Sequence, residues 1–195
     1  LKLRSELNLF ANIRPVKIRR SLLNASTLRE EIIENVDLIV VRELTGGIYF
    51  GEPRGIVNIA GEQKGFNTMT YSSNEIKRIT EVAIKITKKR NNKICSVDKA
   101  NVLEVSQLWR DTVEEVMRNH PDIKFSNMYV DNAAMQLVRD PSQFDVILTN
   151  NLFGVILSDL AEFNEGKQRW TSEVRQLKDL KVKLTDHLSL MVITI

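Results

Sequence analysis

Three arginines lie beside apolar neighbours, near the boundaries of expected strands or turns, and are candidates for binding an anion. They are Arg4, Arg14 and Arg42. The rigid guanidinium fork suits capture of a carboxylate or a phosphate through two parallel hydrogen bonds. Any one of them, taken alone, is more typical of an ordinary surface arginine, so a single arginine does not establish an anion site.

A lysine and two aspartates are the other side chains that suggest chemistry. Lys99 follows Asp98 directly after an apolar stretch and just before a helical pattern. A lysine at the end of a strand can act as a base when burial lowers its pKa. Alternatively, Asp98 caps the next helix and Lys99 is a solvated neighbour. Asp131 and Asp159 are candidate bases or ligands of Mg²⁺ or Mn²⁺, although isolated aspartates mostly cap helices.

Standard catalytic and cofactor motifs are absent from the sequence. It contains no GxGxxG, GxxxxGK[ST], HExxH or GxSxG string, and its nearest approach to a phosphate loop, Thr45–Gly46–Gly47, reads as a turn. His120 and His187 are unpaired and are not expected to be catalytic.

The composition indicates one ordinary globular domain, with room for an appendage. Of 195 residues, 43% are hydrophobic and 27% charged, and the net charge is only +3. Lys and Arg are scattered among Asp and Glu, with one local run at Lys88–Lys89–Arg90, which argues against a nucleic-acid-binding surface. The single cysteine, Cys95, excludes an internal disulfide and reads as a buried filler residue. No apolar stretch approaches the roughly 20 residues that span a bilayer, so we expect a soluble protein of the cytoplasm.

Strand-like and helical patterns alternate along the chain, which predicts a layered α/β domain. Short apolar runs predict strands, and apolar residues at helical spacing predict helices, the first of them capped by Ser26 or Thr27. A glycine-rich stretch at residues 46–66 is expected to be irregular. The predicted strands are residues 38–41, 94–97, 128–130 and 144–149, and the predicted helices are residues 27–35, 74–89 and 102–119.

Five strings closely resemble those of the 3-isopropylmalate dehydrogenases, in that family's order and spacing across residues 1 to about 161. The version Leu44–Thr45–Gly46–Gly47 separates this branch from isocitrate and homoisocitrate relatives. The strings are LFANIRP (9–15), VRELTGGIYFGEPRG (41–55), SVDKANVL (96–103), YVDNAAMQLV (129–138) and NLFGVILSD (151–159).

The resemblance implies that residues 1–161 form the substrate-binding and dimer-forming domain of that fold. This domain would have a layered mixed sheet, flanking helices and an arm at residues 46–66 that is exchanged between subunits. It would lack most of the nucleotide domain. We expect residues 162–195 to be a divergent tail without family resemblance that adds no strand to the sheet. We also expect a homodimer formed through the arm and the apolar stripe of residues 102–116.

The activity implied is NAD-dependent oxidative decarboxylation of 3-isopropylmalate in leucine biosynthesis, with Mg²⁺ or Mn²⁺. The family pattern assigns residues to four roles, and Lys99 and Asp131 of one subunit would complete the site of the other. Those roles are substrate binding by Arg4, Arg14, Arg42 and Asp131, catalysis by Tyr49 and Lys99, a position near the nicotinamide for Asn101, and metal ligation by Asp131 and Asp159.

The sequence departs from the family at the metal site and in extent. Val155 stands where the family has an aspartate ligand, and valine offers no oxygen to a hard cation. The family's N-terminal part and its adenine-binding loop after Ala161 are also not found. We therefore expect this chain to be inactive as it stands; the alternative is a non-catalytic dimerising remnant of a truncated or rearranged gene.

Overall fold

The fold is built on one mixed sheet. A computed structural model describes residues 9–18, 26, 28–163 and 192–194. Four neighbouring strands of the sheet, from β6 to β2, run parallel, β1 is antiparallel to β2, and β8 is parallel to β1. In spatial order the strands are β6 (Lys124–Tyr129), β5 (Lys93–Asp98), β7 (Val146–Thr149), β2 (Asp37–Glu43), β1 (Ala11–Lys17) and β8 (Val192–Thr194).

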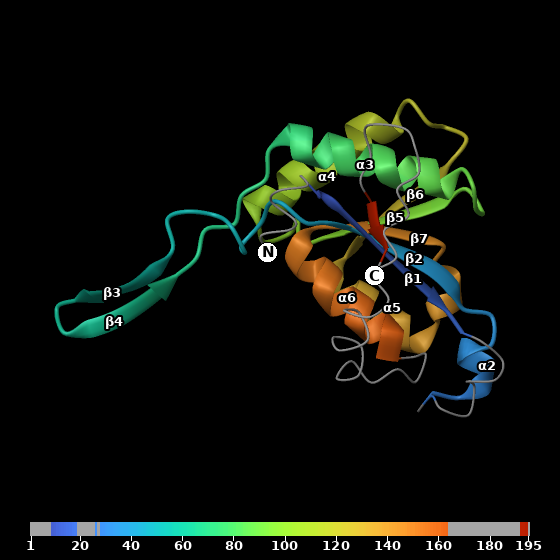
Figure 1. Cartoon of the computed structure of the whole chain (residues 1–195), viewed down its shortest axis with the longest axis horizontal. Helices are drawn as coiled ribbons and strands as arrows, with labels where there is room; N and C mark the ends of the chain where they lie inside the picture. Colours follow the sequence, from blue (N-terminus) through green and yellow to red (C-terminus); the bar gives the residue numbers. More distant parts are fainter. Residues whose placement is uncertain (1–8, 19–25, 27, 164–191, 195) are drawn as a thin grey trace.

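Helices cover both faces of this sheet, which gives three layers (Figure 1). Helices α3 (Ser73–Thr87) and α4 (Glu104–Met117) pack on one face, and α5 (Val130–Arg139) and α6 (Asn151–Phe163) pack on the other. Two short elements complete the second face, α2 (Glu30–Ile33) and the 3₁₀ turn η2 (Pro141–Gln143). The predicted α/β class, with a mixed sheet and flanking helices, is confirmed.

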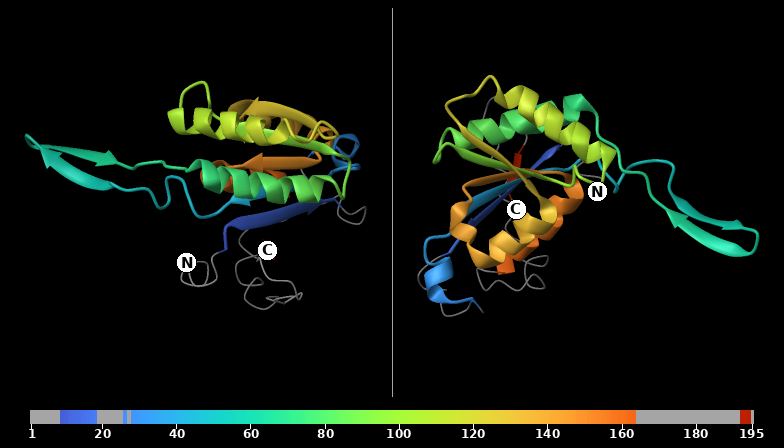
Figure 2. Two further views of the ribbon diagram at one scale, coloured as in Figure 1. Left: turned by 90° about the horizontal axis from the view of Figure 1, so that it is seen from above. Right: turned by 180° about the vertical axis from the view of Figure 1, so that it is seen from behind.

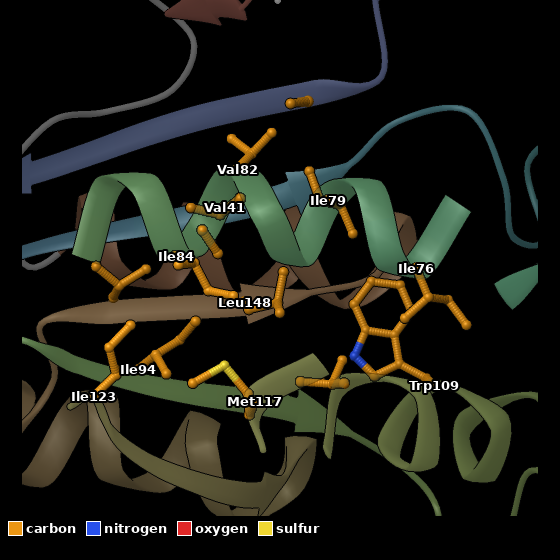
Figure 3. Close-up of a cluster of buried hydrophobic side chains, with 14 of the residues drawn as sticks. Val41, Ile76, Ile79, Val82, Ile84, Ile94, Trp109, Met117, Ile123 and Leu148 are labelled. Carbon is orange, nitrogen blue, oxygen red and sulfur yellow. The ribbon is translucent and has the colours of Figure 1, made fainter. Parts of the chain in front are cut away.

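The central strands and α3 form where their sequences favour them. Strand β7 reads Val-Ile-Leu-Thr and is buried throughout, as expected for a parallel strand covered on both faces. A capping box begins α3, in which Ser72 and Glu75 each satisfy the other's backbone N–H. Its buried residues Ile76 and Ile79 face the sheet and α4, where they meet Leu148 and Trp109 (Figure 3).

The apolar stripe of α4 lies partly inside this core. Trp109, Val113 and Met117 are buried between α3 and the sheet. Val102 and Leu108 of the predicted stripe are 67% and 40% exposed, so α3 covers only part of it, and a dimer contact through this helix stays a prediction. Exposed apolar side chains also lie on α5 and α6, where Met135 is 62% exposed and Ile156 is 51% exposed.

The glycine-rich stretch is more regular than its sequence suggested. It forms a hairpin of β3 (Gly55–Ile59) and β4 (Glu62–Phe66), closed by Ala60 and Gly61 with positive φ angles of 53° and 85°. Two left-handed central residues are the signature of the turn that matches strand twist. The hairpin projects away from the body, and every residue of both strands is exposed (Figure 2).

Two expectations at the ends of the domain need correction. The helix predicted at residues 27–35 is the single turn α2, because its N-cap is Arg29, and Ser26 instead accepts a hydrogen bond from Leu28 N; Thr27 lies outside the described residues. The expectation that nothing after residue 162 joins the sheet is wrong for β8, which pairs with β1. Among the described residues, no helix has the length and apolar character needed to cross a membrane.

Candidate functional site

Several polar residues lie along one edge of the sheet because four parallel strands end there. Strands β2, β7, β5 and β6 share one direction, so the residues at their carboxyl ends lie along one edge. In α/β folds this is the edge where ligands bind. The residues at these four ends include Arg42 and Glu43, Asp98 and Lys99, Tyr129 and Asp131, and Asn150 and Asn151.

Arg42, at the end of β2, is buried and firmly oriented. Its Nε and Nη2 donate to Asn151 Oδ1 over 3.0 and 2.7 Å. The aliphatic part of Arg42 lies on the first turn of α6, where a Cβ added to Gly154 would stand 2.5 Å from Arg42 Cγ. A glycine is therefore needed at this position for the arginine to cross the helix. The structure therefore places a buried and oriented guanidinium where the sequence predicted a binding residue, and its role in binding stays a prediction.

Lys99 and Asp131 are brought together across 32 residues of sequence. Lys99 Nζ lies 2.6 Å from Asp131 Oδ1, and 5.9 Å from the centroid of the Tyr129 ring. The hydrogen bond from Lys99 holds the pKa of the Asp131 carboxyl below its usual value. The pair is partly open to solvent, so Lys99 lies in an ion pair and not in an apolar pocket.

Asp98 is a buried framework residue and not a helix cap. Arg110 donates to both of its oxygens over 2.9 Å, and Ala100 N donates to Oδ1 over 2.9 Å. The N-cap of α4 is Leu103. The Asp98–Arg110 pair therefore fixes the backbone around Lys99.

Of the other two arginines predicted to bind substrate, Arg14 is among the described residues and Arg4 is not. Arg14 lies on β1, where its Nε donates to Asn12 Oδ1 over 2.9 Å and its Nη1 lies 3.1 Å from Glu162 Oε1 of α6. Asn12 pairs with Arg42 in the antiparallel register, so these two side chains lie on the same face of the sheet. Because side chains two residues apart on a strand point to the same face, Arg14 lies on that face too. Arg4 lies outside the described residues.

Tyr49 and Asn101 lie on exposed segments beside this edge. Tyr49 is 43% exposed in the loop between β2 and β3, its ring is tilted against that of Phe50, and no described residue hydrogen-bonds its hydroxyl. Asn101 is exposed in the turn between β5 and α4. One subunit therefore leaves both side chains accessible.

A buried network behind the loop was not foreseen from the sequence. Glu43 is fully buried and accepts from Thr45 N and Gly46 N, each over 2.8 Å, and from Arg78 Nη2 over 3.3 Å. Tyr71 packs under the turn, where a Cβ on Gly46 would meet its ring at 2.5 Å, and burial raises the pKa of its hydroxyl. The two adjacent glycines were the available signal, because such close approach of backbone to a ring excludes any side chain.

The described residues of one subunit do not complete a metal site. They contain no cluster of three or more His, Cys, Asp or Glu side chains suited to a cation. Asp159 lies one helical turn beyond Val155 on α6, and Val155 has no donor atom. Oxygen ligands are what Mg²⁺ and Mn²⁺ require, so this donor set does not fit such a cation by itself.

Comparisons with known proteins identify what this arrangement resembles. A family model described as isocitrate/isopropylmalate dehydrogenase matches residues 1–167. The 3-isopropylmalate dehydrogenase of Prochlorococcus marinus (strain MIT 9312) is 72% identical over 166 residues, which are 85% of this chain and 46% of that protein. The enzyme of the same name from Synechococcus sp. (strain CC9902) is 63% identical over the same shares.

A solved structure is also similar. The crystal structure of isocitrate dehydrogenase from Methylococcus capsulatus matches with a TM-score of 0.74 and 33% identity, over 84% of this chain and 47% of that chain. The chain thus spans about half the length of the curated relatives that it matches.

Proposed function

Because this chain belongs to the isocitrate/isopropylmalate dehydrogenase family, as its motifs predicted, we propose that it supplies the substrate-binding part of a 3-isopropylmalate dehydrogenase. The family is one of dehydrogenases, and the relatives reported above are named for that substrate. The proposed reaction oxidises the C2 hydroxyl of 3-isopropylmalate with NAD⁺ and releases CO₂, as a step of leucine biosynthesis. We also propose that the protein acts in the cytoplasm.

The observation that carries this proposal is that one edge of the sheet, at the carboxyl ends of its parallel strands, carries both an oriented guanidinium, that of Arg42, and the Lys99–Asp131 pair. An oriented guanidinium binds a substrate carboxylate and fixes its position. A lysine next to a carboxylate can move the hydroxyl proton. The full set of proposed roles is substrate binding by Arg4, Arg14, Arg42 and Asp131, proton transfer by Lys99 and Tyr49, and contact of Asn101 with the nicotinamide.

A homodimer is part of the proposal. The arm exposes both of its strands, and α5 and α6 expose Met135, Val138 and Ile156. Apolar groups gathered on one side of a domain favour association with a partner. In the dimer, Lys99 and Asp131 of each subunit would complete the site of the other.

Metal binding is expected to be weak. Val155 leaves Asp159 and Asp131 as the only proposed carboxylate ligands, and we derive no step through a metal. A hard cation loses much of its affinity when one of three carboxylates is removed. We therefore propose that the 195-residue chain, tested as it is, does not reduce NAD⁺. This observation also favours the second candidate function, a non-catalytic remnant that dimerises.

Calorimetry separates the two candidates. The chain and its Val155→Asp variant are each titrated with 3-isopropylmalate in the presence of Mn²⁺, and NAD⁺ reduction is followed by absorbance. The proposal expects weak binding by the chain and binding at least about tenfold tighter by Val155→Asp, since a third carboxylate returns to the site. An absence of binding by both proteins would favour the remnant. Turnover by the unmodified chain at about 1 per second or faster would contradict the account of Val155.

A further inference from the structure

The side chain of Asn151 makes every hydrogen bond that an amide can make. This residue begins α6 and is 1% exposed. Its Oδ1 accepts from Nε and Nη2 of Arg42, and its Nδ2 donates to the carbonyl oxygens of Leu44 and Gly46, both over 3.1 Å. An asparagine amide has two donors and two acceptor sites, so all four are used. One side chain therefore joins β2, the loop toward Tyr49 and α6.

Capping of α6 is the task of the neighbouring residue. Asn150 Oδ1 accepts from Phe153 N over 2.9 Å, which is the bond of an N-cap. The side chain of Asn151 is directed to Arg42 and the loop, and its backbone N donates to Tyr71 Oη over 2.9 Å. A role in starting the helix therefore does not account for the Asn151 amide.

The chemical type of the group also matters. Arg90 and Arg110 donate Nε to the carboxylates of Asp145 and Asp98, whereas Arg42 donates Nε to the neutral amide of Asn151. A carboxylate partner holds a guanidinium and offsets its charge, while an amide holds it and adds no negative charge. A carboxylate at position 151 would also face two carbonyl oxygens without a proton to donate.

We propose that Asn151 is a positioning residue that sets Arg42 and the turn of residues 44–46 in one fixed arrangement, so that binding of a ligand carboxylate at Arg42 depends on the turn leading to Tyr49. This inference rests on the proposed function in taking 3-isopropylmalate as the carboxylate. It adds a residue that touches no substrate and acts through Arg42. The first readout below therefore measures ligand affinity, and the second measures Arg42 itself.

The first readout is affinity, measured by calorimetry with 3-isopropylmalate and Mn²⁺ in the Val155→Asp background. Asn151→Asp is expected to weaken binding about tenfold near pH 8, the value of about one hydrogen bond. The loss should shrink as the pH falls and the new carboxyl is protonated, since a protonated carboxyl can again donate to a carbonyl. The matched control, Asn150→Asp, keeps the cap and should leave the affinity within about twofold.

The second readout needs no ligand. In uniformly ¹⁵N-labelled protein, the Arg42 Nε–H of the parent should give a resolved signal that exchanges slowly with water, because it is buried and bound. Asn151→Ala should shift this signal and speed its exchange, together with the amide signals of Thr45 and Gly47, and Asn150→Ala should not. Unchanged Arg42 and loop signals in a folded Asn151→Ala protein would overturn the proposal.

The two readouts also separate the possible failures. If the Val155→Asp protein binds no 3-isopropylmalate, the proposed substrate is wrong, and the Arg42 signal still decides the role of Asn151. Equal losses of affinity in the Asn150 and Asn151 variants would show a general disturbance of α6 and would overturn the positioning role.

Discussion

Arg42 and Arg110 both lie near the carboxyl ends of the parallel strands, but different groups hold them. Arg110 makes two hydrogen bonds to the buried carboxylate of Asp98, whereas Arg42 makes two to the amide of Asn151. The hydrogen bond that Arg110 donates to Asp98 raises the pKa of Arg110, and the pair of charges stabilises the loop that carries Lys99. Arg110 therefore stabilises the fold around Lys99 through an ion pair, whereas the side chain of Arg42 is oriented by the amide of Asn151.

The largest effect is expected from breaking the frame. In Asp98→Ala, Arg110 loses its counter-charge and Ala100 N loses its acceptor. Removal of one partner of a buried ion pair lowers the free energy of unfolding by about 3–5 kcal/mol. We expect a loss of about 3 kcal/mol here, because Arg110 keeps some solvent contact. Urea unfolding measures this loss. Asp111→Ala, on the exposed side of α4, is the control, and a loss under 1 kcal/mol in Asp98→Ala would contradict the assignment.

A methyl group tests the close packing of Arg42 on α6. Gly154→Ala places a Cβ 2.5 Å from Arg42 Cγ, so the arginine or the helix must shift. Overpacking of this kind lowers the free energy of unfolding by about 1–3 kcal/mol. Gly65→Ala is the matched control, because the nearest atom to its new Cβ is 4.0 Å away on the arm. Thermal unfolding that ranks the control as the more damaged protein would argue against the packing described.

The hydroxyl group of Tyr71 tests the packing of this side chain against the turn of residues 44–46. Tyr71→Phe removes the acceptor of Asn151 N but keeps the ring that packs against Gly46 and Trp109. We expect a loss of about 1–2 kcal/mol in free energy of unfolding, the cost of leaving a buried N–H unsatisfied. Tyr49→Phe should not change stability, since no described residue binds that hydroxyl. Comparable losses in the two variants would contradict this picture.

The smallest effect is expected from acid. Burial raises the pKa of Asp37, but hydrogen bonds from Lys17 and Arg90 outweigh it and leave the pKa lowered. The hydrogen bond from Lys99 lowers the pKa of Asp131. A carboxyl with a lowered pKa in the folded state stabilises the fold above its unfolded pKa of about 4, and this contribution is lost as the pH falls further.

Urea midpoints measured from pH 6 to pH 3 should therefore fall less steeply in Asp37→Asn than in the parent. The change in Asp131→Asn should be smaller, because Asp131 is exposed. A steeper acid dependence in either variant would contradict the direction of its pKa shift.

The elements that could be predicted from the sequence are those with a clear apolar pattern. Helix α3 and strands β5 and β7 fall within a few residues of their predicted positions. The reason is that one face of α3 and nearly all of both strands are buried, which leaves a clear apolar pattern in the sequence. The pattern on α4 was also read correctly, but periodicity shows which face is apolar and not what covers it. That is why the sequence alone did not show that α3 covers Trp109 and Val113 of this stripe.

The site was predicted in part. Family motifs indicated Arg42, Lys99 and Asp131, and the structure brings the last two together. The roles of Asn151 and Glu43 could not be read, because their partners lie in other segments; Asn151 reaches Arg42 across 109 positions of sequence. The fold creates such contacts, and no local pattern records them.

The central claim is that Arg42 binds the substrate carboxylate, whereas Arg110 stabilises the fold around Lys99 and binds no substrate. Protein labelled with ¹⁵N-arginine and titrated with 3-isopropylmalate and Mg²⁺ tests it directly, because both Nε–H groups report in one spectrum. The account predicts that the Arg42 signal shifts with saturation and that the Arg110 signal stays in place. A saturable shift at Arg110 with none at Arg42 would contradict it.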